Sequence, residues 1–479
     1  MKKSFLGFVC ILLLLLIPLS VAAGAGFMIK PQFSELFTAE LYDKTARLDS
    51  IDEPKIVVIS GSSAAFGLDS KLLGDTLGMP VVNFGLYASI GTKAMMDISR
   101  KAIKEGDIIV IAPEMDKQLF SLYFGADSLW QACDGHFSLL SRLSRDDLPS
   151  MLGAYWKFAA SKFRYSRGEP LSPTGIYAKS SFNEYGDISY PDRKYNIMAG
   201  GYDPTHIIDF SPDIVSDDFI DYVNEYVDFT NKRGATVYFG FSPMNYSALR
   251  ADTELEDVEA FTSCLASKLK CPLLGDPNNY IYTEEYFYDS NFHTNETGTI
   301  LHTRRLALDL AEKLGGTEVN IDVPEVPEKP DTPDVPAEYD ENEKYFIFNE
   351  ENGAFYITGV TEEGRKLSVL HTPTAIQGNR TVIISSYAFT NCTNLTELYV
   401  TENVSYISDY AFDGTPKLMK IHILAKDPED PNSTKVNSMG TGLVSGLPAG
   451  AKFYVPKESL ASYIGNYFWS TYAGYLMGE

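Results

Sequence analysis

The chain has 479 residues, of which 44% are hydrophobic and 13% are aromatic, so it can bury large cores and is long enough for two or three domains. This composition excludes a disordered or fibrous protein. The formal net charge of -24 excludes non-specific binding to nucleic acid or anionic lipid, because no Lys/Arg-rich tract past residue 3 offsets the repulsion.

Residues 1–29 are predicted to be a signal peptide or an N-terminal membrane anchor. Two lysines precede an uncharged apolar stretch that runs from Phe5 to Ile29. The small residues Ala23-Gly24-Ala25 fit a cleavage site, and the apolar stretch is also just long enough to cross a bilayer uncleaved. We therefore expect an exported protein that is extracellular or at the cell surface, either released or anchored by this segment.

Residues 30–316 are predicted to form one α/β domain, within which residues 50–316 alternate short apolar runs with helical patterns. The runs lie at 55–60, 80–85, 107–114 and 235–243, and the helical patterns lie at Ser70–Leu77, Lys93–Lys104, Asp217–Lys232 and Leu255–Lys270. Strands that alternate with helices indicate an α/β fold with a parallel sheet covered on both faces. Residues 120–210, rich in Tyr and Ser, interrupt the alternation and are predicted to be a helical insertion over the active-site side.

The first apolar run ends in Gly61-Ser62-Ser63. In parallel sheets the ligand site lies beyond the carboxyl ends of the strands, which is where this loop is expected. A serine in such a loop is a nucleophile if a base and an orienting group lie near it, and otherwise it merely caps the following turn. Glu114 and Asp116 end the third run, where they either line the same pocket or are solvated caps.

A second polar loop lies just before the last helical pattern of this part of the chain. There His293 follows Asp289 by four residues, which puts an imidazole and a carboxylate on the same side of the sheet as Gly61-Ser62-Ser63. Taken alone, an Asp and His pair is more often a surface pair than a catalytic one. The aromatic residues of 280–288 are expected to pack at a strand edge rather than to form a sugar platform, and His302 is expected at the surface.

The cysteines point to neither a disulfide nor a metal site. Cys133, Cys264, Cys271 and Cys392 are widely scattered, with no CxxC pair and no metal-ligand spacing. Seven residues of helix would separate Cys264 from Cys271 by about 10 Å, which is too far for a bridge. We expect small buried thiols, no metal and no cofactor.

Residues 317–342 are predicted to be a proline-rich linker between two domains. Prolines at 324, 327, 330, 333 and 336 fall at every third residue, with acidic residues between them. This is the period of polyproline II, so we expect a stiff, extended and solvated spacer.

The remaining residues, 343–479, contain an internal repeat. Tyr387-Ala388-Phe389 recurs 23 residues later as Tyr410-Ala411-Phe412, and Leu398 recurs as Ile421. Each unit has a short strand and an Ala-Phe turn that cannot bury its apolar side without neighbours. The pattern resembles the BspA-type leucine-rich repeats of bacterial surface proteins, and the end of the chain resembles their capping segment. The resemblance implies a small β-rich solenoid that binds an unidentified protein or surface ligand.

The order of motifs over about residues 50–125 and 210–315 resembles that of the SGNH/GDSL hydrolase superfamily. A Gly-Ser-Ser follows the first strand, an Asn-x-Gly follows the second, a Pro-Glu follows the third, and an Asp/His loop precedes the last helix. The Gly-Ser-Ser and "DSNFHTNETG" forms look closest to the exported branch near the teichoic-acid D-alanylation and alginate O-acetylation proteins. The resemblance implies a flavodoxin-like three-layer fold and a serine ester hydrolase or acyltransferase.

The resemblance also implies roles for individual residues. Ser63 matches the nucleophile, His293 the base and Asp289 the orienting carboxylate, although Asp289 precedes His293 by four residues where the wider family uses three. Ser62 stands where most of the family has Asp.

The oxyanion hole is only partly assigned by the resemblance. The resemblance implies that the backbone N–H groups of Ser63 and Gly85 donate to the oxyanion. No Gly-x-Asn-Asp follows the third strand, so Asn83 and Asn245 are the candidates for the side-chain donor.

The sequence therefore predicts an exported serine esterase or O-acyltransferase acting on acyl esters, acetyl esters above all, of a cell-envelope or extracellular glycan. If the chain is a transferase, the resemblance implies a membrane-bound O-acyltransferase as its partner. The alternative is a catalytically inactive surface binding or adhesion protein that uses the leucine-rich repeats.

Overall fold

The computed structural model describes residues 24, 26–167, 175–190, 193–327, 340–351, 354–374, 382–426, 428, 434–436, 442–466 and 468–479. The predicted signal or anchor at 1–29 and the centre of the predicted linker lie largely outside the described residues. Buried apolar side chains form two clusters between Phe33 and Ile321 and a separate cluster between Phe346 and Leu476. The expectation of a mixed α/β fold with parallel sheets and a repeat region is confirmed.

A four-stranded parallel sheet in the order β2-β1-β3-β4 organises the first half. Its strands are β1 (Ile56–Ser60), β2 (Val81–Gly85), β3 (Ile108–Ile111) and β4 (Thr236–Phe239). Ser60 pairs with Gly85 and Ile59 with Ile111, so the carboxyl ends of β1, β2 and β3 are level. Beyond β4, Phe239 makes an isolated parallel bridge to Leu273.

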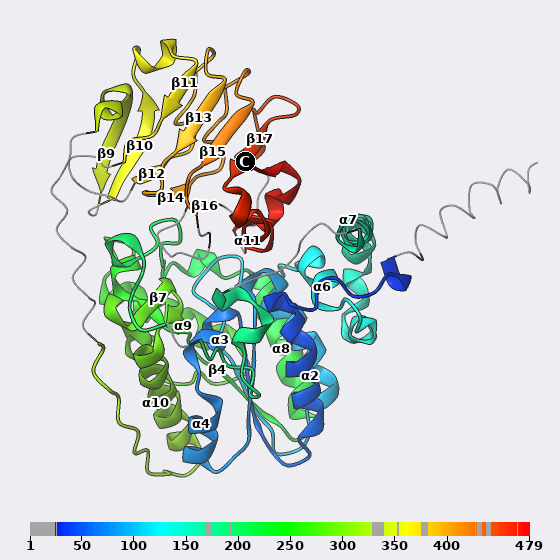
Figure 1. Ribbon diagram of the computed structural model, residues 1–479. Coiled ribbons are helices and arrows are strands. Elements are labelled where there is room, and N and C mark those ends of the chain that lie inside the picture. The colour runs from blue at the N-terminus through cyan, green and yellow to red at the C-terminus, as the bar shows by residue number, and fades with distance from the viewer. Residues whose placement is uncertain are drawn as a thin grey trace, which may run out of the picture.

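Alternate residues of β1 face opposite layers of helices, as a strand period of two requires. Val57 and Ile59 pack with α2 (Glu40–Ser50), α5 (Thr92–Ser99) and α8 (Asp217–Asn231), whereas Ile56 and Val58 pack with α4 (Ser70–Leu77) and α10 (Glu296–Lys313). Figure 1 shows α4 and α10 on one side of the sheet and α2 and α8 on the other. The predicted helices at 70–77, 217–232 and 255–270 are confirmed to within two residues, the last as α9 (Leu255–Lys268).

The insertion contains α6 (Ala126–Ala132) and α7 (Leu148–Ser166), followed by short 3₁₀ turns such as η6 (Gly175–Tyr177) and η7 (Lys179–Ser181). The short helix α3 (Ser62–Gly67) follows β1 directly. The hairpin of β7 (Phe287–Ser290) and β8 (His293–Thr294) leads into α10. These three segments supply the candidate site.

The second half is a solenoid with two sheets, visible as a row of side-by-side strands in Figure 1. One sheet has the order β16-β14-β12-β10-β9 and the other the order β11-β13-β15-β17-β18. The strands are β9 (Phe346–Glu351), β10 (Ala354–Val360), β11 (Val369–His371), β12 (Val382–Ile384), β13 (Glu397–Val400), β14 (Val404–Ile407), β15 (Lys420–Ile423), β16 (Lys435–Val436), β17 (Lys452–Val455) and β18 (Leu476–Gly478). Along the chain, a short helix, α11 (Leu460–Gly465), connects the paired strands β17 and β18.

Equivalent residues of successive repeats lie side by side. Leu398 pairs with Ile421 in parallel register, and the rings of Phe389 and Phe412 lie 5.7 Å apart in the core. On the same sheet as Leu398, the rings of His371, Tyr399, His422 and Tyr454 are stacked on successive strands, with centroids 4.3, 4.2 and 5.1 Å apart. The repeat read from the sequence is therefore a repeat of the fold.

The burial of individual cysteine, tyrosine and histidine side chains agrees with the sequence predictions in most cases. Cys133, Cys271 and Cys392 are buried free thiols, as expected, whereas Cys264 is only half-buried. Burial raises the pKa of the Cys133 and Cys271 thiols to about 12. Tyr280, Tyr282 and Tyr288 are buried, in agreement with packing at a strand edge. The expectation that His302 is a surface residue is wrong, because the inner face of α10 buries it.

We expect Phe412→Ala to lower the free energy of unfolding of the repeat region by about 3–5 kcal/mol, because this fully buried ring contacts its counterpart in the preceding repeat. Met419→Ala, at an exposed position of the same repeat, is the matched control and should change it by less than about 0.5 kcal/mol. Urea unfolding followed by the fluorescence of Trp469, which is buried in the same core, measures both. Equal effects of the two variants would contradict the packing described here.

Candidate functional site

Three side chains form a continuous line of hydrogen bonds at the carboxyl end of β1. The Nε2 atom of His293 lies 2.7 Å from the Ser62 hydroxyl, and its Nδ1 atom lies 2.8 Å from Oδ1 of Asp289. The Tyr177 hydroxyl donates to Oδ2 of Asp289 at 2.6 Å, which fixes the second oxygen of the carboxylate. This is the arrangement of nucleophile, base and orienting carboxylate that serine ester chemistry requires.

The serine beside His293 is Ser62, and the expectation that Ser63 lies there is wrong. Strand β1 ends at Ser60 and α3 begins at Ser62, so Ser62 is the first helical residue and faces the β7–β8 hairpin. The hydroxyl of Ser63 lies 2.9 Å from that of Ser60, and the residue is fully buried. The two serines differ by one step of the helix, which is about 100° of rotation, and this step decides which hydroxyl reaches the imidazole.

The imidazole is also held by an aromatic ring from α3. Phe66 stacks on His293 with ring centroids 3.9 Å apart and planes 5° from parallel. The same helix therefore carries both the serine and the ring that positions its base.

The last carbonyl groups of α3 are bound by side chains from other elements. The carbonyl oxygen of Phe66 accepts from Arg193, from Thr294 at 3.2 Å and from Thr299 at 2.8 Å. That of Gly67 lies 2.5 Å from Nδ1 of His302. These contacts satisfy carbonyls that a helix end leaves without partners.

The two basic side chains among these partners are buried. Burial lowers the pKa of the Arg193 guanidinium to about 10, against the opposing effect of nearby carboxylates including Glu296 and Asp289. Burial also lowers the pKa of His302. His302 is thus a buried structural residue of the site, a role that its position in the helical pattern did not reveal.

Glu114 lines the site rather than forming a solvated cap. Its Oε1 atom accepts from the backbone N–H of Ser63 at 2.7 Å and from the Ser62 hydroxyl at 3.2 Å. Only 5% of Glu114 is exposed, and a Cβ atom at Gly61 would lie 2.6 Å from the same oxygen. Glycine at position 61 therefore allows the carboxylate to approach this backbone.

The residues expected to form the oxyanion hole are bound elsewhere, so that expectation is corrected. The Gly85 N–H donates to Oδ1 of Asn83 at 3.1 Å. The amide of Asn83 donates to the Ala64 carbonyl and to Asp187, both at 2.8 Å. The third candidate, Asn245, donates to the carbonyl of Gly201 and accepts from the N–H of Ser247. Asn83 instead fastens the edge strand β2 to α3.

A second imidazole and carboxylate pair lies near the site. Nδ1 of His206 is 3.0 Å from Oδ2 of Asp203, and the side chain of His206 is 57% exposed. Asn291, which lies between Asp289 and His293 in the β7–β8 hairpin, accepts from the Asp203 N–H and donates to the His206 carbonyl, both at 2.8 Å. The hydrogen bond to Asp203 raises the pKa of His206, and the charges of Asp203, Asp116 and Glu114 raise it further.

Sequence reasoning missed Tyr177, Arg193 and the Asp203–His206 pair. All lie in the irregular insertion, where no hydrophobic periodicity indicates which side chains face the sheet. The three-residue spacing of Asp203 and His206 was the one local signal for a hydrogen-bonded pair.

Residues 372–434 match the BspA type Leucine rich repeat region, with six copies. This part of the chain is therefore a leucine-rich-repeat region of that type. No curated protein matches the chain.

Within the described residues, no group of three or more His, Cys, Asp or Glu side chains is arranged to hold a metal ion. Nor does any helix among them have both the length and the apolar character needed to cross a bilayer.

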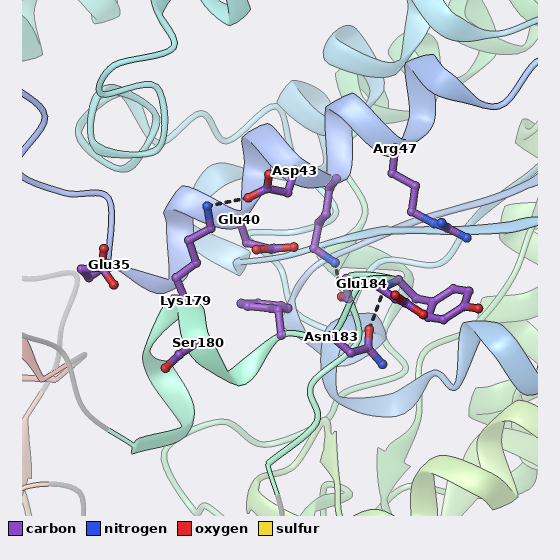
Figure 2. Close-up of a pocket in the computed structure, with 12 residues that line it drawn as sticks. Glu35, Glu40, Asp43, Arg47, Lys179, Ser180, Asn183 and Glu184 are labelled. Carbon is purple, nitrogen blue, oxygen red and sulfur yellow. Dashed lines mark hydrogen bonds and ion pairs between the residues drawn. The ribbon is translucent and has the colours of Figure 1, made fainter.

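A separate polar pocket of about 580 Å³ lies between α2 and residues 179–186 (Figure 2). Lys179 pairs with Asp43 at its rim, and Lys44 at its base donates to the Asn83 carbonyl at 3.1 Å and to the Gly186 carbonyl. Burial raises the pKa of Glu40 to about 7 and lowers that of Lys44 to about 8. None of the residues that line the pocket belongs to the Ser62 site.

We expect Glu40→Gln to remove part of the pH dependence of stability. The pKa of Glu40 is raised from 4.5 to about 7 on folding, so the folded state binds more protons between these values and its stability falls as pH rises through that window. The variant should therefore gain melting temperature relative to the natural protein as pH increases from about 5 to about 7. Thermal unfolding at several pH values measures the difference in melting temperature between the two proteins. A difference that does not change with pH would show that Glu40 does not titrate in this window.

Proposed function

We propose that the protein is an exported serine esterase or O-acyltransferase that acts on acyl esters of a cell-envelope or extracellular glycan, with Ser62 as its nucleophile. The observation that carries the proposal is the line of hydrogen bonds from Ser62 through His293 to Asp289, with distances of 2.7 and 2.8 Å. Export follows from the apolar segment that ends at Ile29, and a surface location agrees with the BspA-type repeats.

The arrangement of the sheet supports a flavodoxin-like SGNH domain as the scaffold. The strand order β2-β1-β3-β4, with a further parallel bridge at the β4 edge, matches the flavodoxin-like order. The nucleophile follows the first strand, where strand order reverses, and this is the usual ligand site of such sheets. A membrane-bound O-acyltransferase is the partner that we propose if the acyl group is transferred rather than released to water.

The residues have distinct roles in the proposed reaction. The oxygen of Ser62 bonds to the carbonyl carbon of the ester, the carbonyl electron pair moves to oxygen, and the Ser62 proton passes to Nε2 of His293. Asp289 accepts from Nδ1–H and stabilises the imidazolium that forms. The imidazolium then protonates the departing alcohol, and the acyl-enzyme reacts with water or with a sugar hydroxyl in the reverse sequence.

The competing proposal is a catalytically inactive surface binding protein. It is favoured by the engagement of both expected oxyanion donors, since the Ser63 N–H is bound by Glu114 and the Gly85 N–H by Asn83. In that case the leucine-rich repeats carry the function.

The first test compares Ser62→Ala with Ser63→Ala in the chain from residue 30 onward, using 4-nitrophenyl acetate as substrate. We expect Ser62→Ala to reduce hydrolysis to the buffer background. Ser63→Ala retains its backbone N–H, so it should keep a rate within about tenfold of the natural protein. Activity lost only in Ser63→Ala would assign the nucleophile to Ser63. Failure of the unmodified chain both to hydrolyse the ester and to be labelled by an active-serine phosphonate would favour the binding protein.

We expect Tyr177→Phe to lower kcat by about tenfold with little change in KM, because it removes a hydrogen bond to a buried carboxylate that orients the base. The ring of Tyr177 packs against Phe66 and stays in the variant, so the fold should be kept. Steady-state kinetics measures the effect. A rise in KM at constant kcat would instead place the Tyr177 hydroxyl in contact with substrate.

A further inference from the structure

Helix α7 exposes a stripe of large apolar side chains. Its inner face is buried in the core of the domain through Met151, Tyr155 and Phe158. Four large apolar residues of its outer face are 54, 68, 45 and 51% exposed, in the order Leu148, Leu152, Trp156 and Phe163. Spacings of four, four and seven residues put these four side chains on one side of the helix. An exposed apolar stripe of this kind marks a contact with a protein or with a membrane.

The end of the N-terminal apolar stretch packs against the same helix. The ring of Phe27 stacks on that of Tyr155 with centroids 5.4 Å apart, and Lys162 donates to the Gly26 carbonyl at 2.9 Å. A Cβ atom at Gly26 would lie 2.5 Å from the Tyr155 hydroxyl oxygen and 3.2 Å from Cβ of Ala159. The backbone at Gly26 is therefore held directly on α7.

The positions that hold the N-terminal stretch adjoin the exposed stripe. Tyr155 is three residues from Leu152, while Ala159 is three residues from Trp156 and four from Phe163. Residues at these spacings are neighbours on a helix surface. Figure 1 shows α7 at the outer edge of the domain, with the start of the described chain beside it. The stripe thus lies where the apolar N-terminal stretch joins the folded domain.

The charge of α7 differs from that of the whole chain. Residues 148–167 contain no acidic residue and four basic ones, Lys157, Lys162, Arg164 and Arg167, whereas the chain has a formal net charge of -24. Two of the four pair with carboxylates from α6 and the turn after it, Lys157 with Asp127 and Lys162 with Asp134. The helix is therefore a locally basic surface on an acidic protein, which lessens the repulsion that the rest of the chain would meet at a bilayer.

We infer that α7 lies on the surface of a lipid bilayer, with its exposed apolar stripe inserted at the level of the headgroups and upper acyl chains, beside the point where the N-terminal stretch enters the same bilayer. The inference takes the anchored rather than the released form of that stretch, and it does not depend on the chemistry of Ser62. The helix lies on the bilayer and does not cross it, because its inner face is buried in protein.

A bilayer fits this surface better than a partner protein does. Leu, Trp and Phe on one face with Lys and Arg beside them is the composition of helices that lie in a membrane interface. The indole ring of Trp156 is suited to that depth, because it has both an apolar body and a polar N–H. A retained anchor would also keep the stripe close to the bilayer, so a small apolar surface is sufficient for docking.

The test uses the full chain reconstituted through its own N-terminal stretch into phosphatidylcholine vesicles, with ordinary or with brominated acyl chains. Bromine quenches tryptophan fluorescence on contact, and Trp156 is exposed whereas Trp130 and Trp469 are buried. Because Trp156 is one of three tryptophans, we expect the brominated lipid to remove about a third of the fluorescence. Trp156→Phe should lose much less.

Two further variants show whether the stripe itself makes the contact. The double variant Leu152→Glu with Phe163→Glu should reduce quenching to the level of Trp156→Phe, because charged side chains are strongly disfavoured among acyl chains. Leu255→Glu, at a 59% exposed position of α9, is the matched control and should leave the quenching unchanged. Thermal unfolding of each variant shows that it is folded, and flotation shows that it remains with the vesicles.

Three results would overturn the inference. The first is a full chain that does not float with the vesicles, and the second is equal quenching in the natural protein and in Trp156→Phe. The third is a blue shift of Trp156 emission that grows with protein density without any quenching by bromine, which would assign the stripe to contact between protein molecules. None of these results bears on ester hydrolysis by Ser62, so this inference and the proposed function fail separately.

Discussion

The candidate site depends on the hydrogen bonds that the last carbonyl groups of one short helix accept from other elements. Helix α3 spans only Ser62–Gly67, which is too short for its own hydrogen bonds to hold Ser62 in place. Its Phe66 and Gly67 carbonyls accept from side chains of the insertion, of β8 and of α10, so the helix is fixed by elements far apart in the sequence. Because His293 immediately precedes Thr294, one of these partners, the contacts that fix Ser62 also fix its base.

The opposite side of α3 is held by a second polar network. Asn83 joins β2 to the Ala64 carbonyl and to Asp187, while the Ile188 N–H donates to the Ala65 carbonyl at 2.9 Å. Lys44 of α2 donates a hydrogen bond to the backbone carbonyl of Asn83. The insertion is therefore part of the site's framework, and the residues between Tyr177 and Ile188 link Asp289 to the helix that carries Ser62.

The sequence predicts the elements of the first half well, because fully apolar strands and glycine-terminated helices leave clear patterns. The loops that hold Ser62, Asp289 and His293 were found for the same reason, since strand ends locate them. The identity of the serine was not predictable, because one helical step separates Ser62 from Ser63 and the start of α3 is set by tertiary contacts. Arg193, Tyr177 and the partners of Asn83 lie on irregular segments, where sequence pattern carries no information about distance in space.

The stacked rings of the repeat region limit how this part of the protein can change in length. Neighbouring rings of the row His371, Tyr399, His422 and Tyr454 lie in register although the chain between them differs in length from one step to the next. The differences in length fall between the strands that carry these rings, and the pairing of those strands stays aligned. Insertions and deletions are thus tolerated at the turns, whereas the loss or gain of a single residue within a strand would turn every following side chain of that strand to the opposite face. Variation between related repeat regions should accordingly concentrate at the edges of the solenoid and leave the row of rings intact.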